Sequence, residues 1–205
     1  MKRPAVTISP GTESALSHAN TPTEDVVIKG RVWKIMSFPE GINRPLLNRL
    51  YDQLDAFLSR HSKVYMIRFD ISLYDSSPHN HEISKLRSFV VKSLKSHYKS
   101  SVDFGWVREQ NTTDDKCHYH CFVLLNGHNA DSTNTTFDIV RHAVELVVDI
   151  NAHFPENCGY MIERHSPESF QAALFRLSYL AKNATKEGKP GAAKGYYFSR
   201  IKRKG

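Results

Sequence analysis

Cysteine is scarce in this 205-residue chain, and the three cysteines form no Cys-x-x-Cys pair. Cys117, Cys121 and Cys158 are odd in number, which argues against a disulfide framework and against a zinc ribbon. Long apolar runs are lacking too: none reaches the roughly 18 residues of a membrane span, and the first residues hold no apolar core of signal-peptide length. We therefore expect a soluble, cytoplasmic protein with reduced thiols and no membrane partner.

Acidic residues are the minority charge: 21 Asp and Glu stand against 28 Lys and Arg, for a formal charge of +7. This balance favours a polyanionic partner, and nucleic acid over a membrane surface. The length suits one well-cored domain and is too short for a nuclease joined to a separate motor domain. We expect a flexible, Ser/Thr/Pro-rich tail over 1–25 and one domain over 26–205, which closes in a basic, glycine-rich segment at about 187–205.

Hydrophobic periodicity predicts both helices and strands. Apolar spacings of three and four predict helices over 43–60, 81–98 and 137–151, and another that opens at Ser166 and carries AALFRLSYLAKNATK. Alternation predicts strands over 65–73, 103–109 and 117–126, one around Tyr160 and an edge strand over 195–200. The fold class is therefore α+β, with one central antiparallel sheet, helices packed on one of its faces and the other face free for a ligand.

The strand CHYHCFVLLN is the first candidate site. His118 and His120 lie two residues apart and so share one face, while the cysteines share the other. If the preceding turn is centred between residues 113 and 114, Glu109 lies opposite His118; a slip by one residue would substitute Gln110. Two histidines and one carboxylate suit an open Mn²⁺ or Mg²⁺ site. The alternatives are two half-exposed histidines without a ligand and a closed structural zinc site.

The segment SYLAKNATK is the second candidate. On a helix, Tyr179, Lys182 and Lys186 fall on the side opposite the apolar stripe, so the tyrosine is expected at the surface with two cations beside it. A phenol becomes a useful nucleophile when a cation or a polarised target assists it. A solvated helix face that carries one amphipathic tyrosine is the alternative.

HYHCFVLLN and YLAK resemble the His-hydrophobe-His and Tyr-x-x-Lys motifs of the HUH endonucleases, which act in rolling-circle replication and relaxation. Within that superfamily the amino-acid sequence around these motifs is most similar to replication initiators of the inovirus (filamentous phage) replication-protein-like, YagK/YfjJ type. IRFDISL, GWVREQ and the closing GYYFSR support the resemblance, in the same order, across residues 64–200.

The resemblance implies a ferredoxin/RRM-like sandwich with His118, His120 and Glu109 as ligands of Mn²⁺ or Mg²⁺. It implies Tyr179 as the nucleophile and Lys182 as its helper. The expected activity is nicking and joining of single-stranded DNA through a 5′-phosphotyrosine, which initiates rolling-circle replication of a phage, satellite or other mobile element. A transposase or conjugative relaxase would use the same chemistry, whereas a DNA-binding repressor or origin protein could keep the fold without the activity.

The expected partners are single-stranded or supercoiled origin DNA, a helicase encoded by the host or the element, and a host polymerase. Basic side chains are expected to hold the DNA backbone, with binding that weakens steeply as salt rises. Two tyrosines of the closing segment are read either as base-stacking residues or as part of an edge strand. The residues assigned to DNA in this way are Arg68, Lys186, Lys194, Tyr196, Tyr197 and Arg200.

Overall fold

The computed structural model describes residues 21–73, 79–110, 117–147, 150–183 and 194–204. Among these residues the main sheet has six strands in the order β6–β3–β5–β4–β8, with β7 also paired to β3, and every pairing is antiparallel. The strands are β3 (Lys63–Leu73), β4 (Val102–Gln110), β5 (Cys117–Asn126), β6 (Ile150–His153), β7 (Gly159–Glu163) and β8 (Tyr196–Phe198). The predicted fold class, α+β with a central antiparallel sheet and flanking helices, is confirmed.

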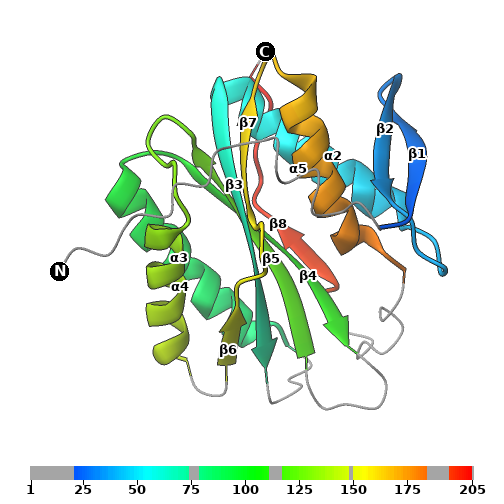
Figure 1. Ribbon diagram of the computed structural model, residues 1–205. Helices are drawn as coiled ribbons and strands as arrows, with labels where there is room; N and C mark the ends of the chain where they lie inside the picture. The colour runs from blue at the N-terminus through cyan, green and yellow to red at the C-terminus, as the bar shows by residue number, and fades with distance from the viewer. Residues whose placement is uncertain (1–20, 74–78, 111–116, 148–149, 184–193, 205) are drawn as a thin grey trace.

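Helices cover both faces of this sheet, not one. Helices α2 (Arg44–Arg60) and α5 (Pro167–Ser178) pack on one face, and α3 (His81–Tyr98) and α4 (Asn134–Glu145) on the other. Figure 1 shows the two pairs on opposite sides of the strands. The expectation of one free face was wrong because β3 is apolar on both faces: Val64 and Met66 are as deeply buried as Ile67 and Phe69. Such a strand needs a layer on each side.

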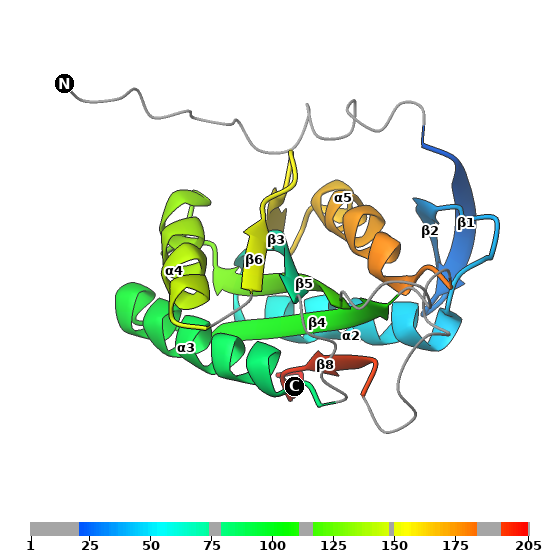
Figure 2. The same cartoon turned by 90° about the horizontal axis from the view of Figure 1, so that it is seen from below.

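A two-stranded hairpin stands apart from the main sheet and was not predicted. Strands β1 (Thr23–Ile28) and β2 (Arg31–Met36) pair through the two-residue turn Lys29–Gly30, where both residues have positive φ, 50° and 77°. Positive φ at both turn positions is typical of the type I′ turn that suits a twisted hairpin. Figure 2 shows the hairpin beside α5 and α2. The folded part therefore begins three residues before the predicted start at 26.

Local signals set the starts of two helices. Asn43 Oδ1 accepts a hydrogen bond from the Leu46 amide at 3.0 Å, and Ser166 Oγ accepts one from the Ser169 amide at 3.2 Å. A proline follows within the first two positions of each helix, where its missing N–H costs nothing. The predicted bounds of α3 are confirmed, and those of α2 are confirmed to within one residue.

Two predicted helices end early. Helix α4 ends at Glu145, and the chain does not continue as a helix to residue 151, because Ile150 begins strand β6 and pairs with Leu73 of β3. Helix α5 ends at Ser178 and tightens into the 3₁₀ turn η1 (Tyr179–Ala181). Among the described residues, no helix is long and apolar enough to cross a membrane.

Candidate functional site

Three neighbouring strands bring the polar side chains together. Residue 118 on β5 pairs with Glu109 on β4, as the turn geometry predicted, and His120 pairs with Asp70 on β3. Gln110 pairs with Cys117, so the alternative register is wrong. Both histidines lie on the sheet face that α2 and α5 cover, while the odd-numbered residues of β5 belong to the core under α3 and α4.

His120 is held between two carboxylates. Its Nδ1 lies 2.7 Å from Asp70 Oδ1 and its Nε2 lies 3.0 Å from Glu109 Oε2, and its ring is 8% exposed. Burial lowers the pKa of the imidazole, but the hydrogen bonds and charges of the two carboxylates outweigh burial and raise it. Burial likewise raises the pKa of Asp70 and of Glu109, and the cations around them reverse the effect, so both pKa values are lowered. The cluster is thus a buried set of paired charges.

His118 is exposed, and its Nδ1 lies 3.0 Å from Ser72 Oγ. Both histidines therefore direct Nδ1 toward strand β3, where Ser72 and Asp70 lie two residues apart. A hydrogen bond from Nδ1 to a neighbouring side chain sets the ring orientation of a metal-binding histidine and leaves its Nε2 for the metal ion. Glu109 Oε1 is buried and has no hydrogen-bond partner among the described residues, while the buried His120 Nε2 has its 3.0 Å contact with Glu109 Oε2.

The second motif meets the first at this point. Lys182 Nζ donates a hydrogen bond to Tyr179 Oη at 2.9 Å and lies 3.2 Å from Glu109 Oε2. The ring of Tyr179 stands edge-on to that of His120, with centroids 5.2 Å apart. Burial lowers the pKa of Lys182, but its contacts with the phenol and the carboxylate raise it overall, so this side chain stays an ammonium ion.

Tyr179 is half-buried rather than at the helix surface, where the helical projection had placed it, and of the two cations expected beside it Lys182 is there, while Lys186 lies outside the described residues. The 3₁₀ turn carries Tyr179 off the axis of α5, and backbone contacts hold the turn. The Asn43 amide bonds the Ala181 carbonyl at 2.7 Å, and the Asn183 amide bonds the Gly41 carbonyl at 3.1 Å. The ring of Phe38 covers Tyr179 with a centroid distance of 5.9 Å. These contacts limit the conformations open to the phenol.

Arg68 belongs to this cluster rather than to a DNA-facing surface. It is 3% exposed, its Nη2 lies 3.3 Å from Asp70 Oδ1, and its guanidinium carbon lies 4.7 Å from the centroid of the Tyr179 ring. The expectation that it holds the DNA backbone does not fit this burial. Asp70 was missed in the sequence. Its signal was the alternation along β3, which places Arg68, Asp70 and Ser72 on one face.

The closing segment forms the edge of the sheet. Strand β8 pairs with β4, which confirms the edge-strand interpretation of Tyr196 and Tyr197. Arg49 lies over the ring of Tyr196 at 5.4 Å, and Arg87 lies over the ring of Tyr197 at 4.7 Å. Both tyrosine rings therefore have one face engaged by an arginine.

The remaining basic residues assigned to DNA lie next to strand β8 or outside the described part of the chain, and the Gly195 carbonyl that follows Lys194 accepts a hydrogen bond from the Arg108 amide at 2.8 Å. Lys194 and Arg200 are exposed on either side of β8, and the carbonyl of Lys194 accepts a hydrogen bond from Asn80. Lys186 lies outside the described residues, as do residues 1–20 of the expected tail.

The donor chemistry of the cluster suits a divalent ion, although the atoms are not gathered around one. Across the described ranges, no three His, Cys, Asp or Glu side chains are arranged as a metal cluster. The carboxylate of Glu109 faces the ammonium of Lys182 instead. His120 Nε2, which faces Glu109 Oε2, and the unbonded Glu109 Oε1 are nevertheless a nitrogen and an oxygen of the kinds that Mn²⁺ accepts, and His118 lies on the same strand face as His120.

Residues 29–194 match the family model described as the YagK/YfjJ C-terminal domain. The chain belongs to this family. It is also 31% identical over 116 residues to the uncharacterized protein YagK of Escherichia coli (strain K12), a match that covers 49% of this chain and 55% of that protein. The chain thus spans about half the length of this relative. No solved structure matches. In this YagK/YfjJ domain the matched range contains the whole cluster: Arg68, Asp70, Glu109, His118, His120, Tyr179 and Lys182.

Proposed function

We propose that this domain is a metal-dependent endonuclease that nicks and rejoins single-stranded DNA through Tyr179, as its resemblance to the HUH endonucleases implies. One observation carries the proposal. The His-x-His strand and the Tyr-x-x-Lys segment, far apart in the chain, converge so that Lys182 bridges Glu109 and Tyr179 at 3.2 Å and 2.9 Å. A structural role for either motif alone would not require this meeting.

The reaction is a transesterification at phosphorus. Tyr179 Oη forms a bond to the scissile phosphorus, the bond from phosphorus to the 3′-oxygen breaks, and the product is a 5′-phosphotyrosine. The phenolic proton leaves to solvent, and the departing 3′-oxygen takes up a proton to become a free 3′-OH. Because one phosphoester replaces another, a 3′-OH can reverse the step and rejoin the strand.

Lys182 assists as a cation rather than as a base. Its raised pKa keeps the ammonium charged, so it stabilises negative charge as it develops on the phenol oxygen or on the phosphate. Asp70 and Ser72 hold the two imidazoles by Nδ1. His118, His120 and Glu109 would hold Mn²⁺ or Mg²⁺, which when bound supplies positive charge to the scissile phosphate.

The free 3′-OH is what a polymerase extends, so we infer initiation of rolling-circle replication of a phage, satellite or other mobile element. The described residues form a six-stranded sheet with its helices and a separate two-stranded hairpin, and we expect a helicase encoded by the host or the element to separate the DNA strands. Supercoiled or single-stranded origin DNA is the substrate class. Transposition or conjugative relaxation would use the same chemistry on other DNA.

The decisive experiment incubates the protein with a labelled oligonucleotide library and Mn²⁺ and looks for a covalent protein–DNA band. Wild type should form it, Tyr179→Phe should not, and Mn²⁺ binding measured by calorimetry should be equal in both. Tyr98→Phe on α3, on the other side of the sheet, is the matched control and should form the band at the wild-type yield.

Each of the other outcomes would contradict the proposal in a different way. A normal adduct yield from Tyr179→Phe contradicts the nucleophile assignment. DNA binding by the wild type without adducts in either Mn²⁺ or Mg²⁺, and unaffected by His120→Ala, indicates a non-catalytic origin-binding protein or repressor. Stoichiometric, tightly held Zn²⁺ with melting on chelation indicates a structural metal site.

A further inference from the structure

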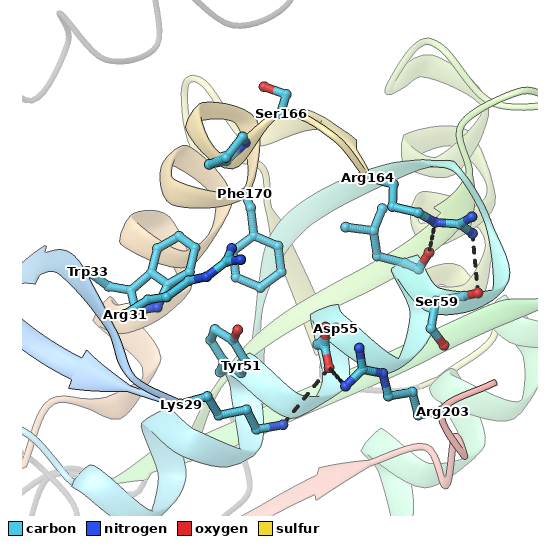
Figure 3. Close-up of a pocket in the computed structure, with 12 residues that line it drawn as sticks. Lys29, Arg31, Trp33, Tyr51, Asp55, Ser59, Arg164, Ser166, Phe170 and Arg203 are labelled. Atoms are coloured by element: carbon cyan, nitrogen blue, oxygen red, sulfur yellow. Dashed lines mark hydrogen bonds and ion pairs between the residues drawn. The ribbon is translucent and has the colours of Figure 1, made fainter. Parts of the chain in front are cut away.

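A second concave site lies at the far end of α5 from Tyr179. It is a pocket of about 370 Å³ between the β1–β2 hairpin, helix α2, the start of α5 and the C-terminal segment. Figure 3 shows Trp33, Tyr51 and Phe170 gathered on one side, with Arg164, Ser59 and Arg203 across from them. None of these residues belongs to the cluster around His120, so the pocket is a separate feature.

The aromatic side of the pocket is preformed. The ring centroids of Trp33 and Phe170 lie 5.0 Å apart, those of Tyr51 and Phe170 lie 5.1 Å apart, and all three side chains are less than 10% exposed. The three rings that line the pocket therefore form a planar apolar wall, on which a nucleobase can stack.

The charge of the pocket lining is positive. Lys29, Arg31, Arg164 and Arg203 line it, and Asp55 is the one acidic residue on the lining. Lys29 lies 2.6 Å from Asp52, next to the pocket, and 3.9 Å from Asp55, and Arg203 lies 3.4 Å from Asp55, so these two cations face two carboxylates. The side chains of Arg31 and Arg164 form no ion pair among the described residues, and their charge favours an anion.

The four cations differ in how they are engaged. The guanidinium of Arg164 donates to the carbonyls of Leu58 and Ser59 at 3.1 Å and 3.2 Å, which fixes it at the end of α2. Arg31 is exposed, and its side chain forms no hydrogen bond or ion pair within the described residues. The tight Lys29–Gly30 turn brings it to the rim of the pocket. Arg31 is therefore the side chain best placed to meet a phosphate that enters from outside.

We propose that this pocket binds one nucleotide of a single DNA strand, with the base against the wall of Trp33, Tyr51 and Phe170 and a phosphate on Arg31. The same chemistry would accept a free nucleotide, and the test below separates the two sources. The inference rests on the proposed function only in taking the bound strand to be the DNA that Tyr179 would nick.

The distance between the pocket and Tyr179 suits binding of a nucleotide several positions away from the nicking site on the same strand. Helix α5 has 12 residues, and at 1.5 Å per residue it separates the pocket from Tyr179 by about 18 Å. A stacked strand advances about 3.4 Å per nucleotide, so about five nucleotides would span the two sites. A stacked strand shorter than this does not reach both sites, so affinity should rise once that length is passed.

The experiment measures the fluorescence anisotropy of a labelled mixed-sequence strand of about 16 nucleotides, without metal, in a Tyr179→Phe background that cannot cleave. Arg31→Ala should weaken binding about tenfold and lower the slope of log K against log salt by about 0.7. Arg141→Ala is the matched control, because it removes another exposed arginine, from α4 on the other side of the sheet, and it should change neither quantity. Trp33→Phe, which keeps an aromatic ring of smaller area, should weaken binding by a smaller factor.

Two results would overturn the proposal. Equal strand affinity and salt slope for Arg31→Ala and Arg141→Ala would show that no phosphate meets Arg31. Binding of a free deoxynucleoside monophosphate that depends on Arg31, with strand affinity independent of it, would make this a mononucleotide site. This assay measures binding and not cleavage, so it tests the pocket separately from the proposed nicking activity. If Arg31→Ala weakens strand binding but the wild type never forms covalent adducts, the pocket proposal holds and the nickase proposal fails.

Discussion

Asp103 on β4 should make the stability of this domain depend on pH in an unusual direction. Its side chain is fully buried and accepts hydrogen bonds from the Phe104 amide at 2.7 Å and from Gln53, which also donates to the Ser199 carbonyl at 2.7 Å. Burial raises the pKa of Asp103 from 3.8 to about 6, although its hydrogen bonds oppose the shift. At pH values between these two pKa values, the folded protein therefore keeps a proton on Asp103 that the unfolded chain has released.

The sign follows from that difference in bound protons. Between pH 4 and pH 6 the folded state binds more protons, so the free energy of unfolding falls as pH rises and then levels off above the folded pKa. A separation of about two pKa units, at 1.36 kcal/mol per unit, corresponds to a loss of about 2.5 kcal/mol between pH 4 and pH 7. Carboxylates with lowered pKa values, such as Asp70, act in the opposite direction at lower pH.

Comparison with Asp103→Asn isolates the effect of this one group. Urea unfolding at pH 4, 5, 6 and 7 should show the stability of wild type relative to Asp103→Asn falling by about 2.5 kcal/mol across the range. Asp138→Asn on the exposed face of α4 is the control, and its difference from wild type should change by less than about 0.5 kcal/mol. A wild-type-minus-Asn difference that is the same at pH 4 and pH 7 would refute the reasoning.

Three further predictions concern the site and the sheet. Lys182→Met should slow formation of the Tyr179 adduct about 10- to 100-fold in a single-turnover assay, because a charged hydrogen bond is worth about 1.5–3 kcal/mol. Asp70→Asn should weaken Mn²⁺ binding about 10- to 100-fold by calorimetry, since it loosens the imidazole that Asp70 orients. Gly105→Ala should cost about 1–3 kcal/mol in urea unfolding, because a Cβ there would overlap the ring of Phe122.

Much of the site was readable from the sequence because its parts are local. The shared face of His118 and His120 follows from strand alternation, and the pairing of Glu109 with residue 118 follows from the turn between them. The bounds of α2 and α3 follow from apolar spacing and, for α2, from the cap at Asn43. Each of these depends on residues within one element or one hairpin.

The errors arose where neighbouring elements decide the conformation. A helical projection put Tyr179 at the surface, but contacts of residues 41–43 with the following turn hold it over His120. Alternation along the strand predicted Arg68 as a surface cation, but its face of the sheet is covered by α2 and α5 and its side chain is buried. The β1–β2 hairpin carries too weak an alternation to be predicted, and its place is set by contacts such as the bond from the Met36 amide to Ser178 Oγ.

The sequence by itself determined the fold class, the two motifs and the register of the central hairpin, because periodicity and turn geometry act over a few residues. Only the tertiary structure decided that Asp70 joins the histidines, that Lys182 bridges Glu109 and Tyr179, and that the hairpin encloses a basic aromatic pocket. The contacts of Asp70 with His120 and of Lys182 with Glu109 link residues 50 and 73 positions apart. They form only when both faces of the sheet are covered, and no local pattern records which segments then become neighbours.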